Sequence, residues 1–130
     1  MKSDQQLVYP ELSYRIVGCA FNAHNGLGGD RKERHYQSAL AQAFTEAGLA
    51  FKEQVYYRIK YKDKLVGKDY LDFLVEDRDG NKVVVEIKSD RRFSRKHIVQ
   101  VIEYLKVTDC RLAILINFGS SAVVFKRIVN

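Results

Sequence analysis

An aspartate and a glutamate stand inside two neighbouring apolar runs of the chain, and a lysine follows the glutamate two residues later. The stretch is "VGKDYLDFLVEDRDGNKVVVEIKSD", residues 66–90, with Asp72 in the first run and Glu86 and Lys88 in the second. Side chains alternate along a strand, so Glu86 and Lys88 share one face. The Asp-Gly dipeptide between the runs predicts a hairpin, which can bring Asp72 near Glu86 although spacing does not fix the register.

These residue types suit metal-assisted hydrolysis of a phosphodiester. Two partly buried carboxylates repel each other, and a divalent cation relieves the repulsion. Mg²⁺ and Mn²⁺ prefer oxygen ligands, typically one or two carboxylates plus waters and substrate phosphates. Lys88 would lie beside such a metal, where an ammonium can hold the scissile phosphate or orient the attacking water. The alternative interpretation is an ordinary Lys–Glu pair on a solvated sheet face.

The surrounding sequence predicts an α/β (α+β) domain with the order α-α-β-β-β-α-β-β. Apolar residues at helical spacing, with Pro10 in a first turn, indicate a helix that ends at the glycines of 26–29. A second helix is expected from about Asp30 to Ala47, with Glu33 on its inward face and Gly48 as its stop. The remaining expected elements are strands at 54–61, 68–77 and 82–88, a turn at 62–67, a helix at 94–108, a strand at 111–119 covered on both faces, and an edge strand at 121–129.

Composition limits the classes of protein to consider. The 130 residues form a single domain, 1–130, and 46% apolar with 29% charged residues is typical of a globular protein. We see no membrane-spanning run and no secretory signal, so we expect a cytoplasmic protein. A net charge of +6 favours a polyanionic partner. The run "KSDRRFSRK", residues 88–96, holds five basic side chains and one acid, which also fits a solvated loop.

The spacing of Asp72, thirteen residues and "EIK" resembles the active-site signature of the PD-(D/E)xK nuclease superfamily. The upstream segment "LGGDRKERHYQSAL", with Glu33 and Tyr36, is similar to the motif of the small GxxExxY group within it, although Asp30 replaces the first glycine. "QVIEYL" resembles the QxxxY helix motif of the RecB-like and lambda-exonuclease-like branch. "LAILINFGS" and "VFKRIV" are similar to the last strands of the GxxExxY group, so the resemblance spans about residues 10–129.

This resemblance implies a restriction-endonuclease-like core, with a mixed sheet of about five strands flanked by helices, and a set of residue roles. Asp72 and Glu86 would be catalytic metal ligands for Mg²⁺ or Mn²⁺, and Lys88 would be the catalytic lysine. It also implies metal ligation by the Ile87 backbone carbonyl, by His24, and by Glu33 directly or through water. Support of the site is implied for Tyr36, Gln100 and Tyr104. A helix cap for His24 and a core position for Tyr104 are the simpler alternatives.

The function that we expect is a metal-dependent nuclease (a hydrolase of ester bonds) that acts on nucleic acid, most naturally DNA. Arg91, Arg92, Arg95 and Lys96 would then guide the phosphodiester backbone toward Lys88. The main alternative is a catalytically inactive nucleic-acid-binding module or a partner subunit of a DNA-processing complex. A protein-interaction domain is a third. Small nucleases of this fold often act as homodimers, and a homodimer is compatible with this sequence.

Overall fold

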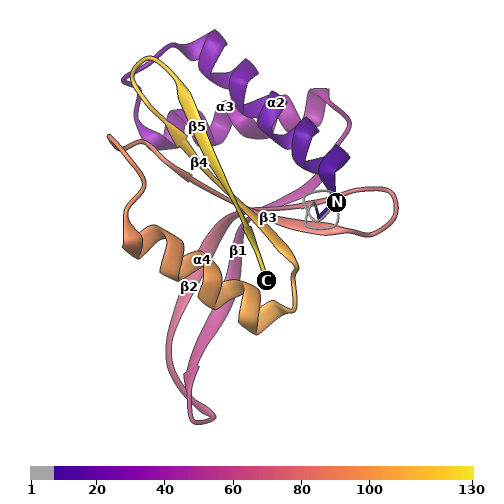
Figure 1. The fold of residues 1–130 in the computed structure, drawn as a ribbon, viewed down its shortest axis with the longest axis vertical. Coiled ribbons are helices and arrows are strands. Elements are labelled where there is room, and N and C mark those ends of the chain that lie inside the picture. The colour runs from indigo at the N-terminus through magenta and orange to yellow at the C-terminus, as the bar shows by residue number, and fades with distance from the viewer. Residues whose placement is uncertain (1–7) are drawn as a thin grey trace, which may run out of the picture.

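The computed structural model describes residues 8–130 and places three helices against a five-stranded mixed sheet (Figure 1). The predicted fold class and element order are confirmed. The elements are α2 (Pro10–Leu27), α3 (Glu33–Glu46), β1 (Ala50–Tyr61), β2 (Lys64–Glu76), β3 (Lys82–Lys88), α4 (Arg95–Thr108), β4 (Leu112–Phe118) and β5 (Val123–Val129). Within residues 8–130, no helix combines the length and the apolar character needed to cross a bilayer.

The strands lie side by side in the order of the sequence, β1-β2-β3-β4-β5. All neighbours are antiparallel except β3 and β4, which run parallel and are joined by α4 as the crossover helix. The expected edge position of the last strand is confirmed. α2 and α3 cover one face of the sheet and α4 covers the other (Figure 1).

Alternation along β3 divides the core into two clusters. Val83, Val85 and Ile87 pack in the cluster that contains α2 and α3, whereas Val84 packs in the cluster under α4. Glu86 therefore belongs to the α4 side, opposite Val85 and Ile87, as the alternation predicts. Every residue of β4 is buried, which matches its nearly continuous apolar sequence.

Three expected boundaries were wrong. α3 begins at Glu33 rather than Asp30, because Asp30 has a left-handed backbone (φ 59°) that cannot continue a helix. The turn between the first two strands contains only Lys62 and Asp63, which have φ values of 48° and 66°. Residues 64–67, expected in that turn, begin β2 instead, and β1 starts four residues earlier than expected, at Ala50.

The alternation of side chains between the two faces of the sheet is shifted in both β1 and β2, at Gln54 and Asp72. The strands pair at Glu53 with Phe73 and again at Val55 with Leu71, and the position between these pairs is left out of the ladder. Phe73 packs on the α2–α3 side, whereas Val55 and Leu71 pack under α4. Gln54 has a left-handed backbone, φ 50°, which breaks the alternation of β1 at this point. The break leaves Asp72 at the junction between the two clusters.

Candidate active site

Asp72 and Glu86 are joined through each other's main chain. The backbone N–H of Asp72 donates to Glu86 Oε1 at 2.8 Å, and the backbone N–H of Ile87 donates to Asp72 Oδ2 at 2.8 Å. The regular pairing of β2 with β3 ends one step earlier, at Phe73 and Val85. Side-chain carboxylates thus replace main-chain carbonyls as acceptors where the two strands separate, and this holds the two acidic groups side by side.

The Glu86 carboxyl is almost fully buried, with 3% of its residue surface exposed. Burial, and then the negative charge of Asp72, raises the pKa of Glu86 from 4.5 to about 8. The backbone hydrogen bond from Asp72 and the positive charge of Lys88 oppose this rise. The protein surroundings therefore favour a protonated Glu86 beside Asp72, and a bound cation would take the place of this proton.

The Ile87 main chain faces the same pair. In a strand the N–H and C=O groups of one residue point to the same side, as the reciprocal bonds of antiparallel pairs require. Because the Ile87 N–H points to Asp72, the Ile87 carbonyl also points toward β2. A neutral oxygen donor is thereby directed to the side of the strand that carries the carboxylates.

Glu33 is the first residue of α3, and it borders the Asp72–Glu86 pair from this helix. Partial burial of its carboxyl raises the pKa of Glu33 although the residue as a whole is exposed, Lys88 lowers it, and the charge of Asp72 raises it. The nearby backbone N–H of Ser89 also lowers the pKa of Glu33. Ser89 Oγ also donates to the Arg31 carbonyl at 3.2 Å. The start of α3 is therefore tied to the end of β3, and the charge of Lys88 acts on both Glu33 and Glu86.

Two glutamines that the sequence analysis missed hold Asp72 from the other side. Gln54 Nε2 donates to Asp72 Oδ1 at 3.3 Å. Gln37 Nε2 lies 3.4 Å from the Asp72 carbonyl and donates to Glu53 Oε1 at 3.2 Å. Because glutamine is common on exposed faces of helices and strands, its position in the sequence gave no signal of this role.

Asn117 fixes the loop that follows Lys88, and it too was missed. It is 2% exposed, accepts from the Asp90 N–H at 2.9 Å and donates to the Asp90 carbonyl at 2.7 Å. Asn117 lies opposite Lys88 in the parallel β3–β4 pair. A signal was present in this case, since Asn117 is the polar exception in the apolar run "LAILINF".

The predicted supporting residues of α4 lie beneath β1 and β2. Gln100 Nε2 donates to Asp69 Oδ2 at 3.2 Å, three residues before Asp72. Tyr104 is buried, and its ring packs edge-on against Tyr57 with centroids 4.9 Å apart. Burial raises the pKa of Tyr104 to about 12, so its hydroxyl stays protonated at physiological pH. Both side chains support the strands that carry the acids, and neither is hydrogen-bonded to Asp72 or Glu86.

Tyr36 holds the loop between α2 and α3, and His24 contacts the connection between β4 and β5. The Tyr36 hydroxyl donates to the Gly28 carbonyl at 2.7 Å, and its ring stacks on Phe118 with centroids 4.4 Å apart. His24 Nε2 lies 2.8 Å from the Gly119 carbonyl, so the hydrogen on Nε2 is directed there. His24 thus has a structural partner, while its ligation of a metal stays a prediction.

The predicted basic residues, Arg91, Arg92, Arg95 and Lys96, are all exposed on the loop after β3 and on the first turn of α4. Ser94 caps this helix together with His97, through hydrogen bonds of 3.3 Å in both directions. Asp90 Oδ2 lies 3.6 Å from His97 Nε2, so one partly exposed pair links the loop to the helix. The four cations therefore extend into solvent from a loop that is anchored on both sides.

The donor set fits a hard divalent cation in its chemistry. Asp72 and Glu86 offer carboxyl oxygens that lie together, and the Ile87 carbonyl is directed to the same side. Over residues 8–130, however, no three His, Cys, Asp or Glu side chains converge closely enough to hold a metal between them. The protein therefore presents a pair of acidic ligands, with Glu33 at its border rather than within it.

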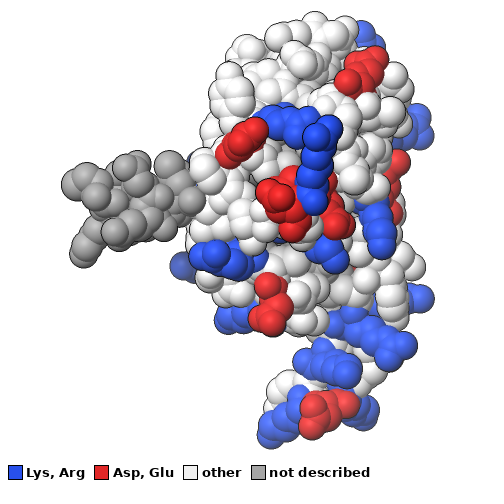
Figure 2. All heavy atoms as spheres, turned by 90° about the vertical axis from the view of Figure 1, so that its right-hand side faces the viewer, with Lys and Arg blue, Asp and Glu red and all other residues white. Residues whose placement is uncertain are grey.

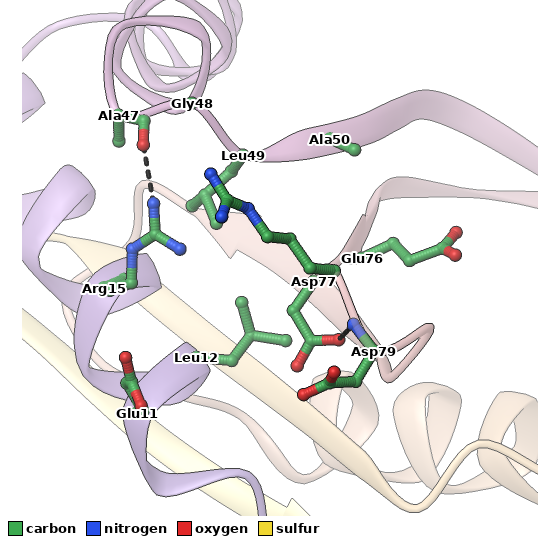
Figure 3. A pocket seen from close by; sticks show the side chains of 11 residues that line it. Glu11, Leu12, Arg15, Ala47, Gly48, Leu49, Ala50, Glu76, Asp77 and Asp79 are labelled. Carbon is green, nitrogen blue, oxygen red and sulfur yellow. Dashed lines mark hydrogen bonds between the residues drawn. The ribbon is translucent and has the colours of Figure 1, made fainter.

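A hollow with a different character lies at the other ends of β2 and β3, away from Asp72 and Lys88. Its volume is about 490 Å³, and its walls come from α2, the α3–β1 connection and the β2–β3 hairpin (Figure 3). Arg15 there donates to the Ala47 carbonyl at 2.6 Å, and Asp77 accepts from the Asp79 N–H at 2.9 Å. Because these charged groups already bind main-chain atoms at a helix end and a turn, we assign them a structural role.

Comparison with known proteins agrees with the arrangement of the strands and helices. The sequence profile of the PD-(D/E)XK nuclease superfamily matches residues 10–128, so the chain belongs to this superfamily. The crystal structure of the protein SSO0001 is similar to this fold, with a TM-score of 0.50 and 15% identity, over 92% of this chain and 78% of that chain. At this identity the likeness shows the fold alone. No curated protein matches the sequence with significant similarity.

Proposed function

We propose that this protein is a Mg²⁺- or Mn²⁺-dependent nuclease that hydrolyses phosphodiester bonds in DNA. Membership of a nuclease superfamily supports the general class. The observation that carries the proposal is the Asp72–Glu86 pair, in which main-chain hydrogen bonds hold two carboxylates together beside Lys88. We also propose that the protein belongs to the small GxxExxY group, which is supported by Glu33 at the border of this pair and by Tyr36, which closes the loop before α3.

Asp72, Glu86 and the Ile87 carbonyl would hold the cation, and Glu33 would contact it directly or through water. When bound, the cation supplies a Lewis acid that lowers the pKa of water and neutralises phosphoryl oxygens. Lys88 would bind a non-bridging oxygen of the scissile phosphate, because an ammonium near the reacting phosphate stabilises the negative charge that develops. Asn117 and Ser89 would fix the backbone that follows this lysine.

The loop cations would bind the DNA backbone on the α4 side of Lys88. Arg91, Arg92, Arg95 and Lys96 project into solvent from a loop that Asn117 and the helix cap hold in place. Phosphate contacts of this kind position a strand without reading its sequence. We therefore expect little sequence preference from this surface.

Cleavage of end-labelled DNA tests the proposal. Single-stranded, duplex, flapped and four-way-junction substrates are incubated with Mg²⁺ or Mn²⁺, beside an EDTA control and Lys88→Ala. Cutting by the wild type that disappears in both controls would support the nuclease, and the product pattern would separate exonuclease, flap and junction activities. Intact substrates together with DNA binding in wild type and variant alike would contradict it and favour a binding module.

A further inference from the structure

The longest strands of the sheet extend beyond it as a two-stranded arm. β2 pairs with β3 only from Phe73 to Glu76, whereas its pairing with β1 continues down to Lys64. Residues 64–71 of β2 therefore have a strand neighbour on one side alone. The resulting projection is the lower hairpin in Figure 1, and we call residues 55–71 the β1–β2 arm.

One face of the β1–β2 arm packs on α4. The opposite face, which we call the outer face, is exposed to solvent. Val55, Tyr57 and Leu71 pack in the cluster under α4. The side chains that alternate with them point away from α4, and among these Tyr56 and Tyr70 are 45% and 46% exposed. Because two-stranded hairpins have little stability of their own, the contact with α4 explains why the arm stays folded. The same contact leaves the outer face of the arm accessible to a ligand.

The outer face combines like charges with aromatic rings. Tyr56 pairs with Tyr70, with ring centroids 5.7 Å apart, and the next outward pair along the arm is Arg58 with Lys68. Like charges placed directly opposite each other destabilise a sheet. Such a pair, two residues from the tyrosines, would be stabilised by an anion between or beside the two cations.

Charge is also concentrated in the arm as a whole. Residues 58–68 hold five basic side chains and one acid, in a chain whose net charge is +6. The acid is Asp63 in the tip turn, and the nearby Asp69 faces α4, where it accepts from Gln100. Figure 2 shows Lys and Arg side chains gathered over this protruding end of the molecule. Within residues 55–71, no acidic side chain therefore opposes the cations on the outer face.

The outer face leads to the candidate active site. Tyr70 and Asp72 are two residues apart on β2, on either side of the inward-facing Leu71. At roughly 3.3 Å per strand residue, Lys68 lies about 13 Å along β2 from Asp72. A nucleic-acid strand bound along the arm would thus continue toward Asp72 and Lys88.

We propose that the outer face of the β1–β2 arm binds a single-stranded segment of nucleic acid, with phosphates on Arg58 and Lys68 and unstacked bases on Tyr56 and Tyr70. Exposed aromatic rings interleaved with cations are the usual platform for unpaired strands, because stacking needs bases that are free of a duplex. A duplex would occupy the cations and leave the tyrosines without a partner. The inference deepens the proposed function, since the bound strand would be the substrate that enters the site.

Binding in EDTA tests this inference separately from cleavage. The probe is a fluorescein-labelled single-stranded DNA, with a matched RNA and a duplex beside it, titrated at several salt concentrations. Arg58→Ala/Lys68→Ala should weaken single-strand binding about tenfold and reduce the salt slope by about 1.4, since each single-strand phosphate contact contributes about 0.7. Tyr56→Leu/Tyr70→Leu should weaken binding about tenfold without changing the slope, and Tyr56→Phe/Tyr70→Phe should retain binding.

The control is Lys106→Ala/Arg111→Ala, which removes two exposed cations at the far end of α4 and before β4. Circular dichroism of every variant checks that the arm stays folded. Wild-type affinity in both arm variants would overturn the inference, as would tighter binding of the duplex than of either single strand. Because no cleavage is measured, an arm-dependent affinity would support this inference even if the nuclease proposal failed.

Discussion

The carboxylates of Asp72 and Glu86 each accept a hydrogen bond from the main chain of the other strand. The Asp72 N–H donates to the Glu86 carboxylate, and the Ile87 N–H donates to the Asp72 carboxylate. Each acid therefore satisfies a backbone N–H where β2 and β3 separate, in addition to carrying an ionisable carboxyl group. Removing either side chain leaves a backbone N–H without its acceptor, which costs about 1–3 kcal/mol when the group is buried. Variants at this pair should be isosteric, so that effects on the chemistry are separated from effects on folding.

Without metal, the stability of the protein should fall as the pH rises from about 4.5 to about 8. The pKa of Glu86 is 4.5 when unperturbed and about 8 in the folded protein, so the folded state binds the proton more tightly over this window. Stability decreases with pH wherever the folded state binds more protons than the unfolded state. Urea denaturation in EDTA across this range measures the effect. Glu86→Gln, which cannot ionise, should show a clearly flatter profile, and parallel profiles would contradict the assignment.

Mg²⁺ and Mn²⁺ should raise the melting temperature of the wild type, because a ligand that binds the folded state stabilises it by mass action. Asp72→Asn should abolish the shift, while Asp79→Asn, in the exposed hairpin at the other end of β2, should keep it.

Ca²⁺ should inhibit cleavage, since it takes more ligands in a looser geometry. Strong activation by Zn²⁺ alone would instead assign His24 or another nitrogen donor to the metal.

The sequence predicted the elements better than their junctions. Periodicity located every helix and strand, and alternation along β3 correctly set Glu86 opposite Val85 and Ile87. Local patterns could not predict the face change at Gln54, because a left-handed glutamine depends on the tertiary contacts of both strands. Spacing likewise left the register of β2 on β3 open, so the hydrogen bonds of Asp72 emerged only from the fold.

Asn117→Ala should destabilise the protein by about 1–3 kcal/mol and reduce cleavage. The substitution leaves the Asp90 N–H and carbonyl without partners and frees the backbone after Lys88. Asn117→Asp keeps the acceptor and loses the donor, so its free energy of unfolding should lie between those of Asn117→Ala and the wild type. Chemical denaturation and cleavage rates measure both effects. Equal activity in all three proteins would show that this loop does not position Lys88.

Neutralising the loop cations should weaken DNA binding in a salt-dependent way. Arg91→Ala/Arg92→Ala removes two exposed charges that follow β3, and each lost duplex phosphate contact should lower the salt slope by about 0.9. Fluorescence anisotropy in EDTA at several salt concentrations measures this slope.

Duplexes of unrelated sequence should lose affinity equally, because phosphate contacts carry no sequence information. Lys106→Ala/Arg111→Ala changes the net charge by the same amount at the far end of α4, and it should leave the slope unchanged. If both double variants lowered the slope alike, the overall charge of the protein would be responsible, and the loop would not be a DNA contact.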